Sequence, residues 1–305
     1  MKKINLGKSD LAVGAIAYGC WRFASTPLAQ AQSNIETALD HGMTLIDTAD
    51  IYGFGEPSGF GGAEALLGQI LKQSPSLRHQ MVLATKGGII PPAPYDSSYD
   101  YLIGACEASL ERLGVDCIDL YQIHRPDLTA PMAETARALN DLTRQGKIRF
   151  VGVSNFSAAQ MRALQAHLET PIVSAQPEFS AWAQAPIIDG VLDWCSETEA
   201  VCLAWSPLAG GALATGEIPD AITSNEDRER FSNLIAVIDR LAAAHDATRT
   251  QIALAFCRSH GASVIPIIGT QRDARIKEAA GAAHISLSRR DWYDIIEARH
   301  GAAMP

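Results

Sequence analysis

Residues 45–53 read Leu-Ile-Asp-Thr-Ala-Asp-Ile-Tyr-Gly, a short apolar run that ends in a carboxylate and leads into a turn. Two later segments have the same pattern: residues 82–86, Val-Leu-Ala-Thr-Lys, and residues 119–124, Asp-Leu-Tyr-Gln-Ile-His. In each, an apolar run is followed by an ionisable residue at or just past its carboxyl end. Parallel barrels carry their chemistry at that position, where the loops after the strands form one face. Asp47, Tyr52, Lys86 and His124 are therefore candidate site residues.

Short apolar runs of the same kind recur along the chain and alternate with helical patterns. Their richness in Val, Ile and Leu is typical of strands that are covered on both faces. The predicted strands are residues 15–18, 44–47, 82–85, 119–123, 150–154, 172–176, 201–204 and 264–268. The predicted helices are residues 28–41, 62–73, 98–113, 131–145, 157–167 and 187–199, with a longer pair within 227–260. Eight strands alternating with helices predict an α/β fold that closes as a (β/α)8 TIM barrel, with a doubly wound open sheet as the alternative.

The stretches outside these elements are local. A hairpin with its turn at residues 7–10 is expected at the N-terminus, and Gly42, Gly114 and Gly146 are expected to end the helices that precede them. Irregular segments 54–61, 87–96 and 206–227 are expected to lie over the C-terminal face of the barrel and to shape a substrate mouth. No linker, repeat or low-complexity tract divides the chain, so we predict one domain over residues 1–305.

Composition limits the possible partners and locations. The chain has 305 residues, of which 47% are hydrophobic, and a net charge of −9, which argues against nucleic acid or an anionic membrane as a partner. No Cys-x-x-Cys spacing and no metal site are found, and the six cysteines are interpreted as reduced, mostly buried thiols. Without a secretory core or a long apolar stretch, the chain is predicted to be cytoplasmic. A monomer that acts on a small molecule is the default expectation.

The sequence resembles the aldo-keto reductase family. The resemblance is carried by Asp-Thr-Ala-x-x-Tyr-Gly at residues 47–53, by Lys86 and by His124. It continues through residues 146–156 (Gly-Lys-Ile-Arg-Phe-Val-Gly-Val-Ser-Asn-Phe), 176–180 (Gln-Pro-Glu-Phe-Ser), 205–211 (Trp-Ser-Pro-Leu-Ala-Gly-Gly) and 265–270 (Ile-Pro-Ile-Ile-Gly-Thr). It implies a bacterial-type reductase that converts aldehydes and ketones to alcohols by hydride transfer from a nicotinamide cofactor.

The four candidate residues suit that chemistry. Reducing a carbonyl group requires a proton donor, and tyrosine, with an ordinary pKa of about 10, donates poorly near neutrality. A nearby lysine ammonium is expected to lower the Tyr52 pKa by roughly 1–3 units. We therefore assign Tyr52 as the general acid, Lys86 and Asp47 as the pair that tunes it, and His124 as the residue that orients the substrate oxygen.

Each residue also has a purely structural interpretation. Asp47 suits a helix N-cap, Lys86 a solvated loop, His124 a satisfied core position and Tyr52 a packing role under a loop. Two other functions stay open as well. The fold also serves as a non-catalytic, NADPH-binding regulatory subunit, and a barrel lyase or isomerase could use Lys86 as a Schiff-base nucleophile.

The cofactor site is implied by the resemblance, since Gly-x-Gly-x-x-x-Gly at residues 53–59 lacks the spacing of a dinucleotide fingerprint. Ser154, Asn155 and Gln176 would hold the nicotinamide carboxamide, and Trp205 would stack on its ring. Arg272 and Arg275 would clamp a 2′-phosphate, which favours NADPH, although residues 267, 268 and 279 depart from the NADPH-specific pattern and keep NADH as an alternative. The full set of predicted cofactor contacts is Ser154, Asn155, Gln176, Trp205, Ser206, Pro207, Leu208, Gly269, Thr270, Arg272, Arg275 and Glu278.

Aromatic residues near the predicted strand ends suggest the substrate pocket. Trp21 and Phe54 are the principal candidates, and Phe23, Tyr95 and Trp182 are further ones. Such a lining favours aromatic or aliphatic carbonyl compounds, and we expect broad reduction of aldehydes and some ketones.

Overall fold

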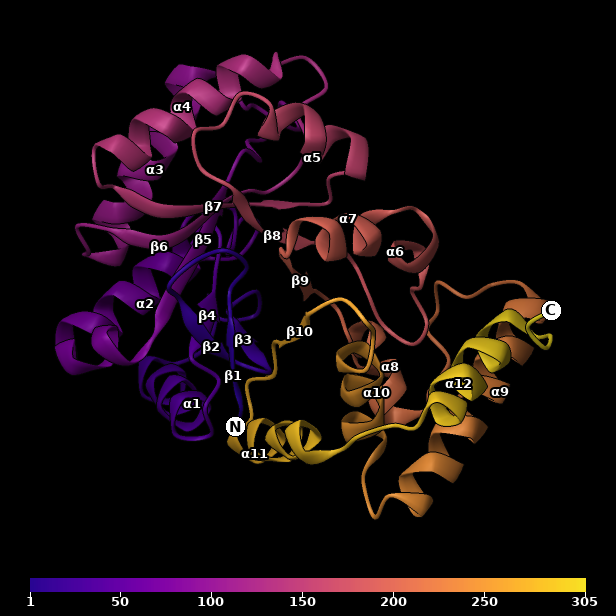
Figure 1. Cartoon of the computed structure of the whole chain (residues 1–305). Helices are drawn as coiled ribbons and strands as arrows, with labels where there is room; N and C mark the ends of the chain where they lie inside the picture. Colours follow the sequence, from indigo (N-terminus) through magenta and orange to yellow (C-terminus); the bar gives the residue numbers. More distant parts are fainter.

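The computed structural model describes residues 1–305 and shows a closed barrel of eight parallel strands, in the order β10-β3-β4-β5-β6-β7-β8-β9, with helices outside it (Figure 1). The strands are β1 (Lys3–Asn5), β2 (Ala12–Gly14), β3 (Ala17–Gly19), β4 (Leu45–Asp47), β5 (Val82–Gly87), β6 (Ile118–Ile123), β7 (Ile148–Ser154), β8 (Ile172–Gln176), β9 (Val201–Ala204) and β10 (Val264–Ile268). All eight predicted barrel strands are present, each within two residues of its predicted bounds.

Closure depends on the pairing of the last strand with the first. β10 pairs in parallel with β3, with Ile267 opposite Ala17, and also with β9, with Val264 opposite Cys202. These pairings join the two edges of the sheet, so the barrel prediction is confirmed and the open sheet is excluded.

The helices surround the barrel. They are α1 (Leu28–Asp40), α2 (Gly62–Gln73), α3 (Tyr99–Leu113), α4 (Met132–Arg144), α5 (Ala158–Gln165), α6 (Ala185–Ile188), α7 (Val191–Thr198), α8 (Ala212–Thr215), α9 (Asn225–Ala244), α10 (Arg249–Arg258), α11 (Asp273–Ala280) and α12 (Arg289–His300), with 3₁₀ helices η1 (Pro75–Gln80), η2 (Ala209–Gly211) and η3 (Gly281–His284). In Figure 1, α9 and α12 pack together on the side of the barrel away from α2 and α3. The three predicted stop glycines follow α1, α3 and α4 at positive φ.

Two predicted segments differ in detail. The helix predicted over residues 187–199 is two helices, α6 and α7, because Gly190 between them has a φ of 85° that breaks the helical path. The segment 206–227, predicted as irregular, contains η2 and α8. The predicted N-terminal hairpin is present, since β1 pairs antiparallel with β2.

The hairpin closes the amino-terminal end of the barrel. Leu6, Leu11 and Val13 belong to the same buried cluster of 13 residues as the side chains inside the barrel, such as Leu45 and Leu120. The turn lies directly against β8, because a Cβ added at Gly7 would come within 2.6 Å of the Val173 carbonyl oxygen. The interior is therefore packed with apolar side chains at this end and has polar ones at the other.

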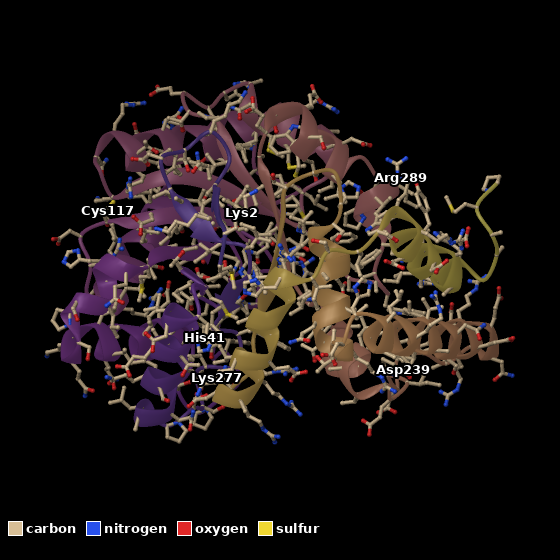
Figure 2. All side chains as sticks on the ribbon, turned by 60° about the horizontal axis from the view of Figure 1, so that its bottom comes forward. Lys2, His41, Cys117, Asp239, Lys277 and Arg289 are labelled. Atoms are coloured by element: carbon tan, nitrogen blue, oxygen red, sulfur yellow. The ribbon has the colours of Figure 1, made fainter.

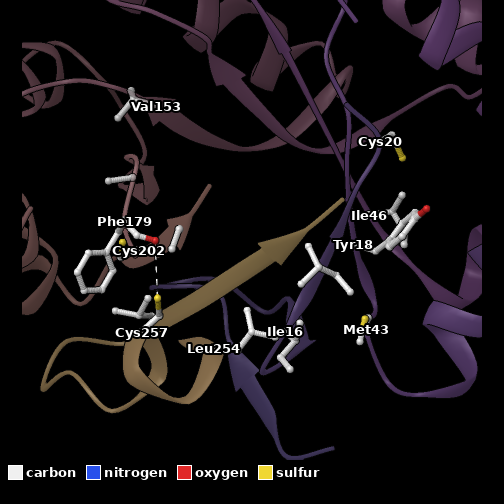
Figure 3. Packing of buried hydrophobic residues seen from close by; sticks show 14 of the residues in the cluster. Ile16, Tyr18, Cys20, Met43, Ile46, Val153, Phe179, Cys202, Leu254 and Cys257 are labelled. Atoms are coloured by element: carbon white, nitrogen blue, oxygen red, sulfur yellow. Dashed lines mark hydrogen bonds between the residues drawn. The ribbon is translucent and has the colours of Figure 1, made fainter. Parts of the chain in front are cut away.

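The main core lies between the barrel and its helices. It contains 67 buried residues, including the outward-facing Ile16, Tyr18 and Ile46 (Figure 3). Five of the six cysteines are buried, none forms a disulfide, and Cys117 alone is partly exposed (Figure 2). No helix has both the length and the apolar character needed to cross a membrane.

Candidate active site

The alternation of side chains along the strands directs the candidate residues into the barrel. In β4, Leu45 belongs to the interior cluster and Ile46 to the outer core, so Asp47 faces inward. By the same period of two, Ala84 in β5 is followed by the inward Lys86, and Leu120 in β6 by the inward Gln122. Polar residues from three adjacent strands therefore meet at the carboxyl end of the barrel.

Lys86 connects the reactive groups. Its Nζ donates hydrogen bonds to Asp47 Oδ2 at 2.6 Å, to the Thr48 carbonyl oxygen at 2.8 Å and to the Tyr52 hydroxyl oxygen at 3.1 Å. Its side chain is completely buried, and that of Asp47 nearly so. Three acceptors satisfy the three hydrogens of the ammonium group, so its position is fixed.

The pKa values of Lys86 and Tyr52 are both raised, whereas a lowered value was predicted for Tyr52. Burial alone would lower the Lys86 pKa, but Asp47 and Tyr52 together raise it above its ordinary value, so the ammonium form persists at neutral pH. The Tyr52 pKa is raised, not lowered as predicted, because burial outweighs the opposing effect of Lys86. In this state Tyr52 is a protonated phenol beside a fixed positive charge, which is the starting form that a proton donor needs.

His124 stands across from Tyr52. The ring centroids are 5.8 Å apart in an edge-to-face arrangement, and the His124 backbone N–H donates to the Gly87 carbonyl oxygen at 2.8 Å. Burial, together with Lys86 and Arg125, lowers the His124 pKa well below its usual value. The imidazole is therefore neutral at physiological pH, and its Nδ1 has no partner within the protein.

Two buried amides complete the surroundings of Asp47. Gln122 Nε2 and Gln176 Nε2 each donate to Asp47 Oδ1 at 3.0 Å, and Gln176 also donates to Gln122 Oε1 at 3.2 Å. Gln122 was not among the predicted site residues. The available signal was its position two residues before His124, since alternate residues of a strand face the same side.

A pocket of about 480 Å³ opens in front of Tyr52 and His124. Trp21 and Phe54, the principal pocket candidates, line it and are 63% and 57% exposed. Arg22, Ile51, Gly53, Glu56 and Ile89 complete the lining, and sequence reasoning missed their part in it.

Other aromatic candidates lie elsewhere. Phe23 is completely buried in the core, and Trp182 packs edge-to-face on Phe231 with Arg299 over its ring. Tyr95 does not line the pocket. Burial in the outer core accounts for Phe23, and Trp182 is partly buried against that core.

The predicted nicotinamide contacts form one hydrogen-bonded group at the ends of β7, β8 and β9. Ser154 Oγ donates to the Gln176 carbonyl oxygen at 2.8 Å, and Asn155 Nδ2 donates to Ser154 Oγ at 2.8 Å. Trp205 Nε1 donates to Asn155 Oδ1 at 3.0 Å, which fixes the plane of the indole ring. Asn155 and Ser206 hold positive φ angles of 59° and 52°. Asn adopts this region more readily than most residues, whereas it is uncommon for Ser and is often found at functional sites.

The predicted adenosine-phosphate residues lie at the neighbouring strand end. Gly269 and Thr270 follow β10, and the Tyr18 hydroxyl donates to the Thr270 carbonyl oxygen at 3.1 Å. Arg272 is the residue before α11, and Arg275 lies in its first turn; both are exposed. Glu278, half-buried in α11, accepts Gln251 Nε2 at its carbonyl oxygen. Pro207 and Leu208 follow Ser206 in the segment after β9.

The barrel agrees with comparisons to known proteins. The chain belongs to the aldo/keto reductase family, whose model matches residues 15–299. It is 44% identical to a 6-dehydroglucose reductase of Novosphingobium aromaticivorans, over 98% of this chain and 96% of that one. It is 34% identical to a 6-dehydroglucose reductase of Agrobacterium fabrum, over 97% of each chain.

A solved structure resembles the fold closely. The crystal structure of a thermostable aldo-keto reductase in complex with the inhibitor epalrestat superposes with a TM-score of 0.81 and 27% sequence identity, covering 98% of this chain and 100% of that one. Family membership makes the chain an oxidoreductase whose general chemistry is carbonyl reduction, in a family that uses nicotinamide cofactors.

Proposed function

We propose that this protein reduces aldehydes and ketones to alcohols with NADPH, with Tyr52 as the general acid. The observation that carries the proposal is the contact set of Lys86, whose ammonium group joins the Asp47 carboxylate to the Tyr52 hydroxyl at the wall of the pocket. A regulatory subunit that only binds the cofactor would have no need of this buried charge, which is costly to desolvate.

The residues act on the substrate oxygen. The bound cofactor supplies the hydride. A substrate carbonyl oxygen seated between the Tyr52 hydroxyl and the neutral His124 ring accepts hydrogen bonds that orient it. As negative charge develops on that oxygen, Tyr52 donates its proton, and the Lys86 ammonium stabilises the phenolate left behind. Asp47, held by two amides, keeps Lys86 in place.

The residues at the strand ends fit a nicotinamide cofactor. Ser154, Asn155 and Gln176 offer hydroxyl and amide groups near one another, and Trp205 presents an oriented ring for stacking. Arg272 and Arg275 are exposed guanidinium groups at a helix N-terminus, a suitable environment for a phosphate. These features support NADPH as the preferred cofactor, with NADH as the alternative.

The two relatives extend the proposal to a substrate class. Both are named 6-dehydroglucose reductases, and each matches nearly the whole chain. We therefore include polyhydroxylated aldehydes among the substrates, beyond the aromatic and aliphatic carbonyl compounds that the pocket aromatics suggest. We further propose a cytoplasmic monomer with one domain over residues 1–305, for which the unpaired cysteines support a reducing compartment.

The test follows the absorbance of NADPH or NADH at about 340 nm, the usual reporter of nicotinamide oxidation. It uses 6-dehydroglucose and 4-nitrobenzaldehyde with wild type and Tyr52→Phe. We expect the variant to lose roughly 10²- to 10⁴-fold in kcat, because it lacks the proton donor. Its quenching of tryptophan fluorescence by NADPH should match that of wild type.

Two other results would overturn the proposal. An inactive wild type that still binds NADPH would favour the regulatory subunit. Trapping of substrate on Lys86 by borohydride would favour the lyase, which the structure opposes because a nucleophilic lysine needs a lowered pKa and that of Lys86 is raised.

A further inference from the structure

One carboxylate in the substrate pocket has no part in the proposed reaction. Glu56 lines the pocket with Tyr52 and His124, yet its side chain forms no hydrogen bond or ion pair with the protein. Its Oε2 atom is closed off from solvent and has no donor, whereas Oε1, which also lacks a partner, is not closed off. Because carboxylate oxygens are nearly always hydrogen-bonded once water is excluded, a donor group that enters the pocket would meet Oε1 as a free acceptor.

The loop presents this carboxylate at a fixed place beside the reactive phenol. The Glu56 backbone N–H donates to the Gly53 carbonyl oxygen at 2.9 Å, and the Glu56 carbonyl oxygen accepts the Gly59 N–H at 3.0 Å. Two tight turns therefore follow Tyr52 directly. A substrate whose carbonyl oxygen lies at Tyr52 would meet Glu56 with a neighbouring part of its own chain.

The rest of the lining indicates what that part is. Trp21 and Phe54 expose aromatic rings on which the C–H groups of a substrate would pack. Arg22 lies over the Trp21 ring and has no carboxylate partner. A polyhydroxylated aldehyde combines apolar C–H faces with hydroxyl donors and acceptors. An apolar aldehyde would leave the Glu56 carboxylate without a donor.

We propose that Glu56 accepts hydrogen bonds from substrate hydroxyl groups and so sets the preference for polyhydroxylated over apolar aldehydes. This inference rests on the proposed reductase function. Arg22 is the alternative partner of Glu56, because its guanidinium group could pair with the Glu56 carboxylate in place of the substrate hydroxyl groups when the pocket is filled. In that case loss of Glu56 would affect all substrates alike, whereas hydroxyl recognition predicts an effect on hydroxylated substrates only.

The experiment compares Glu56→Leu and Glu56→Gln with wild type on 6-dehydroglucose and on 4-nitrobenzaldehyde, each with saturating NADPH. We expect Glu56→Leu to lower kcat/KM for 6-dehydroglucose by about 10- to 100-fold, mainly through KM, since a hydrogen bond to a charged group is lost. Turnover of 4-nitrobenzaldehyde should stay within about 2-fold. Glu56→Gln should retain part of the preference, because an amide oxygen still accepts. Glu229→Gln, at an exposed acid on α9, is the matched charge control.

The outcomes separate this inference from the function on which it rests. Equal losses on both aldehydes, or no change in their ratio, would overturn the role of Glu56 while leaving the reductase intact. Absence of NADPH oxidation by wild type with any aldehyde would instead overturn the proposed function. Near-ultraviolet circular dichroism of each variant establishes that the fold is retained, and Glu56→Gln carries the test if Glu56→Leu misfolds.

Discussion

Asp50 lies between Asp47 and Tyr52 in the sequence, and its side chain is completely buried with neither carboxylate oxygen hydrogen-bonded. Its backbone N–H donates to the Lys86 carbonyl oxygen at 3.0 Å, so Asp50 lies next to Lys86. Burial, and next the nearby Glu64, raise the Asp50 pKa to about 8. Asp50 is therefore mostly protonated at neutral pH, which keeps a second negative charge away from Lys86 and Asp47.

This shift predicts how stability depends on pH. The folded protein holds the Asp50 proton up to a pKa of about 8, whereas the unfolded chain releases it near 3.8, so the Asp50 contribution to stability falls as pH rises between these values. Asp50→Asn does not titrate. The free energy of unfolding of this variant, minus that of wild type, should increase by about 1.4 kcal/mol per pH unit across that window. Urea denaturation at several pH values measures it, and a constant difference would refute the shift.

Arg272 and Arg275 permit a prediction on cofactor choice. Ile267 and Ile268, which depart from the NADPH-specific pattern, are buried in β10, whereas Arg272 and Arg275 are exposed. Replacing both with alanine should lower kcat/KM for NADPH by about 10²- to 10⁴-fold and leave NADH nearly unchanged, since each charged hydrogen bond to phosphate contributes about 1.5–3 kcal/mol. Steady-state kinetics with both cofactors checks this. Equal losses for NADPH and NADH would contradict a 2′-phosphate contact.

At the scale of elements, α2 and α3 are in close contact at Gly68. A Cβ at this position would lie 2.1 Å from the Arg112 carbonyl oxygen, a backbone atom that cannot move aside easily. Gly104, exposed in α3, has no atom within 4 Å of the equivalent position.

We therefore expect opposite effects from the same substitution. Gly68→Ala should destabilise the protein by about 1–3 kcal/mol through overpacking. Gly104→Ala should stabilise it by about 0.5–1 kcal/mol, because alanine is the better helix former. Midpoints of urea denaturation measure both, and similar midpoints for the two variants would argue against a tight α2–α3 contact.

The elements were largely predictable because their signals are local. Apolar runs bounded by polar residues marked the eight strands, and glycines marked three helix ends. The division of α6 from α7 escaped prediction, since the periodicity of residues 187–199 continues through Gly190 while the φ of that residue breaks the helix. Closure depends on the pairing of β10 with β3, which no local pattern encodes.

In the site, too, some features follow from local sequence and others depend on contacts between distant residues. The positions of Asp47 and Lys86 follow from strand parity. Gln122, Asp50 and Glu56 were missed because their importance arises from contacts, or missing contacts, with residues far away in the sequence. The direction of the Tyr52 pKa shift was predicted wrongly for a related reason, since the extent of burial is a property of the whole fold.

At the scale of the whole molecule, the cysteines are spread over the fold. Cys20 follows β3, Cys106 lies in α3, Cys195 in α7, Cys202 in β9 and Cys257 in α10, and all five are buried. Cys117, which precedes β6 at the amino-terminal end of the barrel, is partly exposed, and burial raises its pKa. The pocket lies at the opposite end.

Cys117 is therefore a site for chemical labelling of the native protein, and the five buried cysteines report local opening of the structure. A chromogenic disulfide reagent should modify Cys117 of the native protein before the other five thiols, and leave reductase activity unchanged. The others should react only as their surroundings open, because a thiol must be both exposed and ionised to attack. Mass spectrometry of each modified cysteine over time would then show which part of the barrel opens first, and simultaneous labelling of all six in the native state would contradict the packing described here.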